Sequence, residues 1–219
     1  MSSDIYGKPI VWLTSYPRSG NTFLRTILWH SFGLRSASVY PNDLGENKTL
    51  KEYVGHIDHD PDVEMKLYQN GIPLIKTHEW PEDNNPAIYI LRDGRDACVS
   101  LWEFWGQRLS LEDVIEGKQN FGTWAGHVDA WHPWDRPDTL FLKYEELVLD
   151  LSKALRDISN FMGKEKIRDT ITDRSIMVES DGRCIKKKKT DWRTAFSETQ
   201  LQRFLEINEK ILKKTGYMV

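Results

Sequence analysis

Short apolar runs, each followed by turn formers and then by helical spacing, recur along the chain. Residues 10–13 form a continuous apolar run of the kind found in strands buried on both faces of a parallel sheet. Turn formers occupy residues 16–21, and apolar residues recur at helical spacing from Thr22 onward. This pattern predicts a strand, a tight loop and a helix.

The same order returns further along the chain. Apolar runs at residues 72–78, 87–91 and 139–142 each end in polar residues, and helical spacing follows over 145–162 and 197–214. Repeated strand–helix alternation favours a parallel sheet with helices on both faces. We therefore expect an α/β fold, a P-loop-like three-layer architecture with a central, mostly parallel sheet flanked by helices.

The stretch 33–71 is polar and irregular, with a turn signal at 40–43 and short helices expected at 49–53 and 62–69. No internal repeat or low-complexity tract interrupts the pattern. With 219 residues and 39% hydrophobic content, the chain is large enough to bury a core, and we expect a single domain over residues 1–219.

Charge and cysteine content narrow the function classes. A net charge of −3 argues against nucleic acid as a partner. No apolar run reaches membrane-spanning length and the first residues lack a signal-peptide pattern, so we expect a cytoplasmic protein without a membrane span. Cys98 and Cys184 lack metal-ligand spacing, and no metal site is expected.

The loop before the first helix combines features that suit an anion. Backbone N–H groups and the positive end of a helix dipole face whatever lies over the loop. Arg18 adds a cation, and Ser19 and Thr22 add hydroxyl donors. The alternative is an ordinary strand-to-helix turn with an exposed arginine.

Polar residues also follow two later strands. Lys76 and His78 end the 72–78 run, where open α/β sheets bind their ligands, so His78 is a candidate base; a structural histidine is the alternative. Arg92 follows the next strand, and Ser100 falls on the second turn of the helix after it, so both can reach one anion. The alternative is that Arg92 pairs with a nearby aspartate.

Aromatic and basic residues are concentrated in two stretches. Five of the nine tryptophans fall within residues 101–134 and build either a core or the wall of an apolar pocket. Residues 183–189 contain five Lys or Arg, which form either a solvated segment or a clamp on an anion.

Six stretches in order along nearly the whole chain resemble the sulfotransferases that use 3′-phosphoadenosine 5′-phosphosulfate (PAPS). The family's phosphosulfate loop, approximately TYPKSGTTW, appears at residues 15–23 as SYPRSGNTF. Its KTH is residues 76–78, and its Arg with a Ser eight residues later is matched by Arg92 and Ser100. The remaining three motifs, GSWxxHVxxW, YED and GDW, correspond to residues 122–131, 144–146 and 190–192.

The resemblance implies a role for each matching residue. Arg18 to Thr22 would surround the 5′-phosphosulfate, Arg92 and Ser100 would bind the 3′-phosphate, and His78 would be the general base, assisted by Lys76 and Arg18. The acceptor would be a small, apolar or aromatic molecule with a hydroxyl or amine. The implied donor-binding residues are Arg18, Ser19, Gly20, Asn21, Thr22, Phe23, Arg92, Ser100, Tyr144, Arg183, Lys186 and Lys188. Independently of the resemblance, the aromatic-rich stretch suggests the acceptor-binding residues Trp102, Phe104, Trp105, Trp124 and His127.

The sequence differs from the family pattern at two points, and two alternative functions are considered. Arg18 replaces the family's usual lysine, and the RKG that precedes GDW is poorly kept, so the basic contact falls on residues 183–188. A P-loop kinase is the nearest rival enzyme, although the G-x-x-x-x-G-K-[ST] signature is absent. A nucleotide-binding module without catalysis is the other rival, which the Lys76–His78 pair disfavours.

Overall fold

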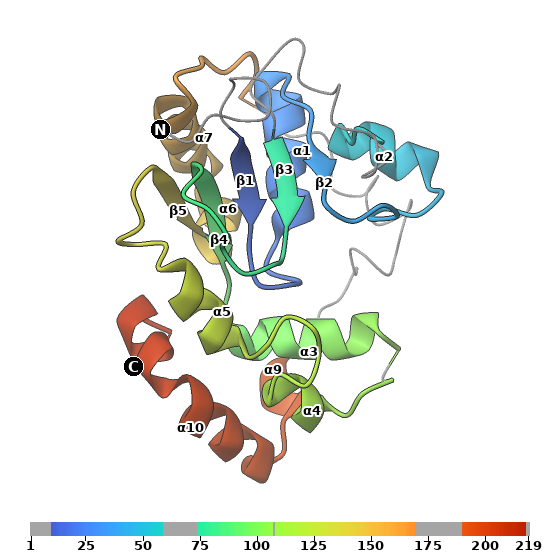
Figure 1. Cartoon of the computed structure of the whole chain (residues 1–219), viewed down its shortest axis with the longest axis vertical. Coiled ribbons are helices and arrows are strands. Elements are labelled where there is room, and N and C mark those ends of the chain that lie inside the picture. Colours follow the sequence, from blue (N-terminus) through green and yellow to red (C-terminus); the bar gives the residue numbers. More distant parts are fainter. Residues whose placement is uncertain (1–9, 59–73, 107, 170–189, 218–219) are drawn as a thin grey trace.

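A five-stranded parallel sheet forms the centre of the chain (Figure 1). The computed structural model describes residues 10–58, 74–106, 108–169 and 190–217. All pairings between neighbouring strands are parallel, and the strand order is β2-β3-β1-β4-β5. The strands are β1 (Val11–Thr14), β2 (Ala37–Ser38), β3 (Leu74–Thr77), β4 (Ala87–Leu91) and β5 (Thr139–Lys143). The expected α/β fold with a parallel sheet is confirmed.

Helices cover both faces of the sheet, as the buried apolar runs of the strands require. One face packs against α1 (Asn21–Phe32), α6 (Tyr144–Leu149) and α7 (Leu151–Met162). The other face meets α5 (Trp124–Trp131), where Tyr89 of β4 contacts the ring of Trp131. The remaining described helices are α2 (Lys48–Val54), α3 (Gly94–Phe104), α4 (Leu111–Ile115), α9 (Trp192–Ala195) and α10 (Glu198–Thr215).

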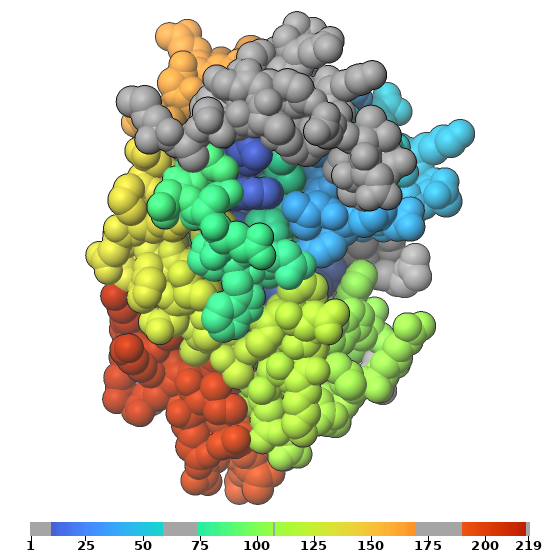
Figure 2. Space-filling model, viewed as in Figure 1, coloured from blue at the N-terminus to red at the C-terminus, as the bar shows by residue number. Residues whose placement is uncertain are grey.

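Helices α3, α4, α9 and α10 gather beyond the carboxyl ends of β1 and β3. In Figure 1 the arrows of β1 and β3 point toward α3, with α4, α9 and α10 beyond it. On the face drawn in Figure 2, α10 lies at the opposite end of the molecule from α2. The carboxyl edge of the sheet therefore faces α3, so the ends of β1, β3 and β4 lie inside the molecule, between the sheet and this helix.

The observed ends of the helices differ from the helical periodicity at one predicted helix and agree with it at another. The single helix predicted over 145–162 is wrong, because the chain breaks at Asp150 into α6 and α7. Asp150 has φ −135° and accepts a hydrogen bond from the N–H of Lys153 at 2.9 Å, so its short side chain caps α7. At the last helix, Ser197 and Gln200 form the expected capping box. The helix predicted at 62–69 lies outside the described residues.

Strand order creates the position of the site. From β1 the chain turns toward β3 and the β2 edge, whereas from β4 it turns toward β5 on the other side. Ligands of open α/β sheets bind where the direction reverses, outside the carboxyl ends of the strands. The reversal lies between β1 and β4, so Arg18 after β1 and Arg92 after β4 flank it.

Candidate active site

The loop between β1 and α1 presents unpaired polar groups. No side chain caps α1, so its first N–H groups point out of the helix toward the loop. Ser19 is 1% exposed, and no described residue hydrogen bonds to its Oγ. A buried hydroxyl without a partner is uncommon in folded proteins. The loop therefore has donors that a bound anion could satisfy.

Gly20 lets the loop approach an aromatic ring. Its φ of +107° suits glycine, and a Cβ here would lie 2.4 Å from Cδ2 of Tyr144. Tyr144 begins α6 directly after β5, and its ring meets the edge of Phe23 at a centroid distance of 6.3 Å. Two aromatic side chains thus lie beside the loop, and a side chain at residue 20 would collide with the Tyr144 ring.

Two arginines meet across the reversal of the sheet. Arg18 has φ +68° and donates from Nε to Oγ of Ser100 at 3.2 Å, with its guanidinium 4.6 Å from the ring centroid of Phe104. Arg92 is 5% exposed and donates from Nη1 to the carbonyl of Arg18 at 3.0 Å. Its Nε has no partner among the described residues. Arg18 therefore contacts both Arg92 and Ser100, the two residues predicted to reach one anion.

Arg92 is also held from behind. Its Nη2 lies 3.4 Å from Asp96, and its guanidinium lies 5.3 Å from the ring centroid of Tyr144. The indole N–H of Trp124 donates to the Arg92 carbonyl at 3.2 Å. The side chain therefore pairs with an aspartate, as the alternative expected, and still leaves Nε for another acceptor.

The end of β3 carries the titratable residues. Lys76 pairs with the carboxylate of Asp43. Nδ1 of His78 lies 2.8 Å from the carbonyl oxygen of Ser15, which can only accept, so Nδ1 carries the proton. This tautomer leaves the lone pair on Nε2, to which no described residue hydrogen bonds. The His78 side chain is held with one basic nitrogen unpaired.

The surroundings keep His78 neutral. Burial lowers its pKa well below the usual 6.5, and the nearby Lys76 ammonium lowers it further. The ring stacks on Tyr40 with centroids 5.8 Å apart and meets the edge of Phe121 at 5.9 Å. A neutral imidazole near pH 7 can accept a proton but is a weak base, and its strength rises wherever an anion offsets the Lys76 charge.

A cavity of about 380 Å³ joins these groups. Its lining includes most of the residues singled out in the sequence: Arg18, Gly20, Asn21, Thr22, Phe23, Lys76, His78, Arg92, Ser100, Phe104, Trp105 and Tyr144. Ser19 does not line the cavity and is buried in the loop between Arg18 and Gly20, which do. The loop, the two arginines and the β3 end thus face one space.

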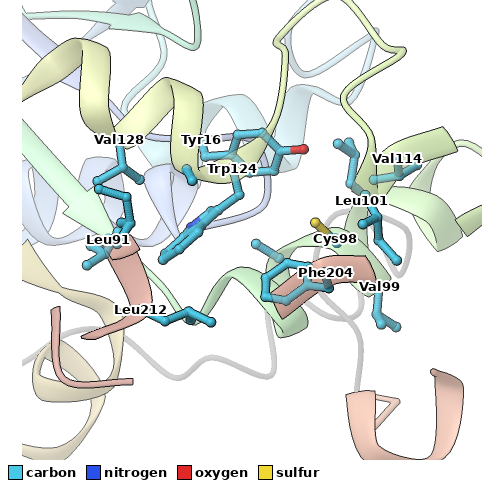
Figure 3. Close-up of a cluster of buried hydrophobic side chains, with 14 of the residues drawn as sticks. Tyr16, Leu91, Cys98, Val99, Leu101, Val114, Trp124, Val128, Phe204 and Leu212 are labelled. Atoms are coloured by element: carbon cyan, nitrogen blue, oxygen red, sulfur yellow. The ribbon is translucent and has the colours of Figure 1, made fainter. Parts of the chain in front are cut away.

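Three predicted acceptor contacts lie elsewhere. Trp124 is buried in the core among Leu91, Val128 and Phe204, as Figure 3 shows. His127 is fully buried and bonds to the Tyr89 hydroxyl at 2.9 Å and the His78 carbonyl at 3.1 Å. Trp102 packs against the same core. None of the three lines the cavity, because the tryptophan-rich stretch mainly fills the space between helices. Arg183, Lys186 and Lys188 lie outside the described residues.

The cavity also contains residues that the sequence analysis missed. Tyr40, Asp43 and Phe121 line it and surround Lys76 and His78. Tyr40 and Asp43 belong to the turn predicted at 40–43, but β2 before that turn has only two residues and gives no strand pattern. Within the described residues, no His, Cys, Asp and Glu side chains cluster as a metal site would require. No helix among them is long and apolar enough to cross a membrane.

Known proteins resemble this chain in sequence and in fold. Human sulfotransferase 1C2 is 28% identical over 188 residues, which cover 65% of this chain and 62% of that protein. Cytosolic sulfotransferase 17 of Arabidopsis thaliana is 31% identical over 180 residues, which cover 68% of this chain and 50% of that protein. The chain thus spans between half and two thirds of the length of these curated relatives.

Two solved structures share the fold. A mouse sulfotransferase, SULT7A1, complexed with PAP, has a TM-score of 0.63 at 18% identity, covering 97% of this chain and 89% of that one. A retinol dehydratase in complex with retinol and PAP has a TM-score of 0.63 at 20% identity, covering 94% and 82%. The family model described as the sulfotransferase domain matches residues 8–216. That match covers nearly the whole chain, which confirms the resemblance: the chain belongs to the sulfotransferase domain family.

Proposed function

We propose that this protein transfers a sulfuryl group from PAPS to a hydroxyl or amine of a small apolar or aromatic acceptor. The observation that carries the proposal is His78, which lines a cavity together with Lys76, Arg18 and Arg92 and whose Nε2 has no hydrogen-bond partner among the described residues. Family membership and the PAP named in the structures of two neighbours support the donor class. We propose one sulfotransferase domain over residues 1–219.

The donor side of the cavity fits a doubly phosphorylated nucleotide. The N-terminus of α1 and the Ser19 hydroxyl suit the 5′-phosphosulfate, because no described side chain caps the helix and Oγ of Ser19 has no hydrogen-bond partner among the described residues. The free Nε of Arg92 and the Ser100 hydroxyl suit the 3′-phosphate. Phe23 and Tyr144 supply rings for the adenine. Contacts from Arg183, Lys186 and Lys188 stay predictions.

PAPS, when bound, supplies a sulfuryl group on a phosphate that leaves readily. His78 would take the acceptor proton at Nε2, since Nδ1–H is already committed to the Ser15 carbonyl. Lys76 and Arg18 would stabilise the charge that gathers on the transferring and leaving oxygens. Arg18 stays charged throughout, so only Lys76 of the two could release a proton. No step in this scheme draws on a metal ion.

Aromatic rings define the acceptor side. Tyr40, Phe121, Phe104 and Trp105 line the cavity, and the rings of Tyr40 and Phe121 contact that of His78. An apolar ring carrying a hydroxyl would satisfy these walls better than a polyanionic sugar, because Asp43 and Glu103 add negative charge to the lining.

The direct test follows ³⁵S from labelled PAPS to a panel of phenols, aliphatic alcohols and arylamines. The expected result is labelled product in the wild type, with none in His78→Ala despite unchanged PAP binding. Product formed equally by His78→Ala would remove His78 as the base. Binding of PAP without product on any acceptor would favour the nucleotide-binding module, and ³²P transfer from ATP would favour the kinase.

A further inference from the structure

The cavity wall around Lys76 and His78 is built by a turn that follows β2. We refer to residues 40–45 as the β2 turn. The N–H of Asp43 donates to the Tyr40 carbonyl at 3.3 Å, and the N–H of Gly45 donates to the Asn42 carbonyl at 3.1 Å. Tyr40, Asn42 and Asp43 line the cavity. The turn is therefore hydrogen bonded within itself and contacts the site.

Asp43 places a buried carboxylate in the wall of the cavity. Its side chain is 4% exposed, and its two oxygens are held by two different cations. Oδ2 accepts from Nη1 of Arg25 at 2.6 Å, and Oδ1 pairs with Nζ of Lys76. Burial opposes ionisation of Asp43, but the charges of Lys76 and Arg25 outweigh it and lower the pKa. Asp43 is thus a carboxylate and a poor proton acceptor.

Arg25 fixes the far oxygen of Asp43. This arginine lies on α1 and is fully buried. Its Nε donates to the Ser36 hydroxyl at 2.8 Å, and Nη2 donates to Nδ1 of His56 at 2.6 Å. Burial and the Arg25 charge lower the pKa of His56 to about 4, so His56 accepts as a neutral ring. A guanidinium bound on three sides leaves Asp43 little freedom to move.

The same turn contacts the base. The N–H of His78 donates to the Tyr40 hydroxyl at 2.9 Å, and the two rings stack. Nζ of Lys76 lies 5.4 Å from the centroid of the Tyr40 ring. The β2 turn therefore contacts both titratable residues at the end of β3: Tyr40 holds His78, and Asp43 holds Lys76.

We propose that Asp43 is a positioning residue: its carboxylate, anchored by Arg25, holds the Lys76 ammonium in the cavity beside His78. The inference rests on the proposed function, in which Lys76 stabilises charge during transfer. Without Asp43, Lys76 keeps its charge but loses the carboxylate that pairs with it. Since small misplacements of a charge-stabilising group reduce turnover strongly, kcat should fall by up to about 100-fold. Affinity for PAP should not fall, because a negative charge leaves the lining.

Steady-state kinetics and PAP titration of Asp43→Asn test this split. The matched control is Asp157→Asn, since Asp157 lies on α7, pairs with Lys153 at 2.9 Å and lies outside the cavity lining. We expect a lower kcat with equal or tighter PAP binding for Asp43→Asn, and wild-type values for the control. In a Lys76→Gln background, Asp43→Asn should cost nothing further, because its effect passes through Lys76. Additive losses, or weaker PAP binding, would overturn the proposal.

A second readout does not depend on turnover. In ¹⁵N-lysine NMR spectra, the ammonium signal that Lys76→Gln removes belongs to Lys76. It should be protected from solvent exchange in the wild type and in Asp157→Asn, and lose that protection in Asp43→Asn. Unchanged protection in a folded Asp43→Asn would overturn the proposal. A wild type that binds PAP yet transfers no sulfate would contradict the proposed function, while the NMR signal would still decide whether Asp43 holds Lys76.

Discussion

The two sides of the cavity differ in how completely their polar groups are bonded. On the donor side, formed by the β1–α1 loop and the end of β4, the Ser19 hydroxyl and Nε of Arg92 have no partner among the described residues. On the base side, at the end of β3, Lys76 pairs with Asp43, and His78 is held through Nδ1, its N–H and its carbonyl. Nε2 of His78 has no hydrogen-bond partner within the described chain.

This difference separates binding from chemistry. Buried polar groups normally find partners within the protein, so those that do not are candidates for satisfaction by a ligand. The donor side therefore suits recognition of an anionic nucleotide. The base side suits a group whose geometry is fixed before the acceptor arrives, which is how positioned residues raise rates. Substitutions on the two sides should accordingly affect different measured quantities.

The largest expected effect comes from the base side. His78→Gln should lower kcat about 100- to 10,000-fold, the usual contribution of a general base. PAP affinity should stay within about threefold of wild type, since no ligand phosphate is assigned to His78. Turnover assays and calorimetry measure the two quantities. His132→Asn, at an exposed helix end with φ 40°, is the control, because asparagine tolerates that backbone conformation. Loss of PAP binding in His78→Gln would break the separation of the two sides.

The donor side should respond in the opposite manner. Arg92→Gln should weaken PAP binding about 10- to 100-fold, the value of lost charged hydrogen bonds. Adenosine 5′-phosphosulfate lacks the 3′-phosphate and should lose less affinity. Calorimetry on both nucleotides measures the ratio. Arg95→Gln is the matched control, since Arg95 pairs with Asp93 and the Tyr217 carbonyl outside the cavity lining. Equal losses for both nucleotides would remove Arg92 from the 3′-phosphate.

Gly20 provides a further test of the donor side. Gly20→Ala combines an unfavourable φ with a collision at Tyr144 and should lower the free energy of unfolding by about 2 to 3 kcal/mol. Gly163→Ala has a similar sign of φ (+59°) and open space around it, so it should lose only about 1 kcal/mol. Denaturant titration measures both. PAP binding should weaken in Gly20→Ala but not in Gly163→Ala. An equal loss of stability in both variants would mean that the Tyr144 ring moves aside without cost.

The smallest expected effect is a pH dependence beneath the base side. Burial lowers the pKa of His127 to about 3, so the folded state leaves this ring neutral while the unfolded chain binds a proton near pH 6.5. Stability is therefore lost as the pH falls from 6.5 toward 3. His127 alone should cost about 1 kcal/mol between pH 6.5 and 5.5. Unfolding of His127→Gln at both pH values should show a loss smaller by that amount; an identical loss would mean that His127 is protonated in the fold.

Much of the fold could be predicted because local signals and tertiary structure agree. The apolar run at 87–91 coincides with β4, and Ser197 caps α10 as its capping-box pattern requires. The break at Asp150 was missed because the apolar spacing continues across α6 and α7. Periodicity records which face is buried, whereas a single capping side chain decides where a helix ends.

The donor side could be predicted better than the base side. Arg18, Arg92 and Ser100 follow recognisable strands, so their convergence follows from topology. Asp43 and Tyr40 follow a two-residue strand in an irregular stretch, and nothing local indicates that they reach Lys76 and His78.

Aromatic density gave the least reliable guidance on the acceptor site. Phe104 and Trp105 line the cavity, whereas Trp124 is buried in the core, although all three belong to one aromatic-rich stretch. Composition does not distinguish a ring that fills the core from one that borders a cavity.

Calorimetric titration of the protein with PAP, run beside adenosine 5′-monophosphate and beside ATP with magnesium, tests the central claim most directly. The account predicts tight binding of PAP, clearly weaker binding of the monophosphate because the 3′-phosphate contacts at Arg92 and Ser100 are lost, and no preference for ATP with magnesium. Equal affinity for PAP and the monophosphate, or tighter binding of ATP with magnesium, would contradict it.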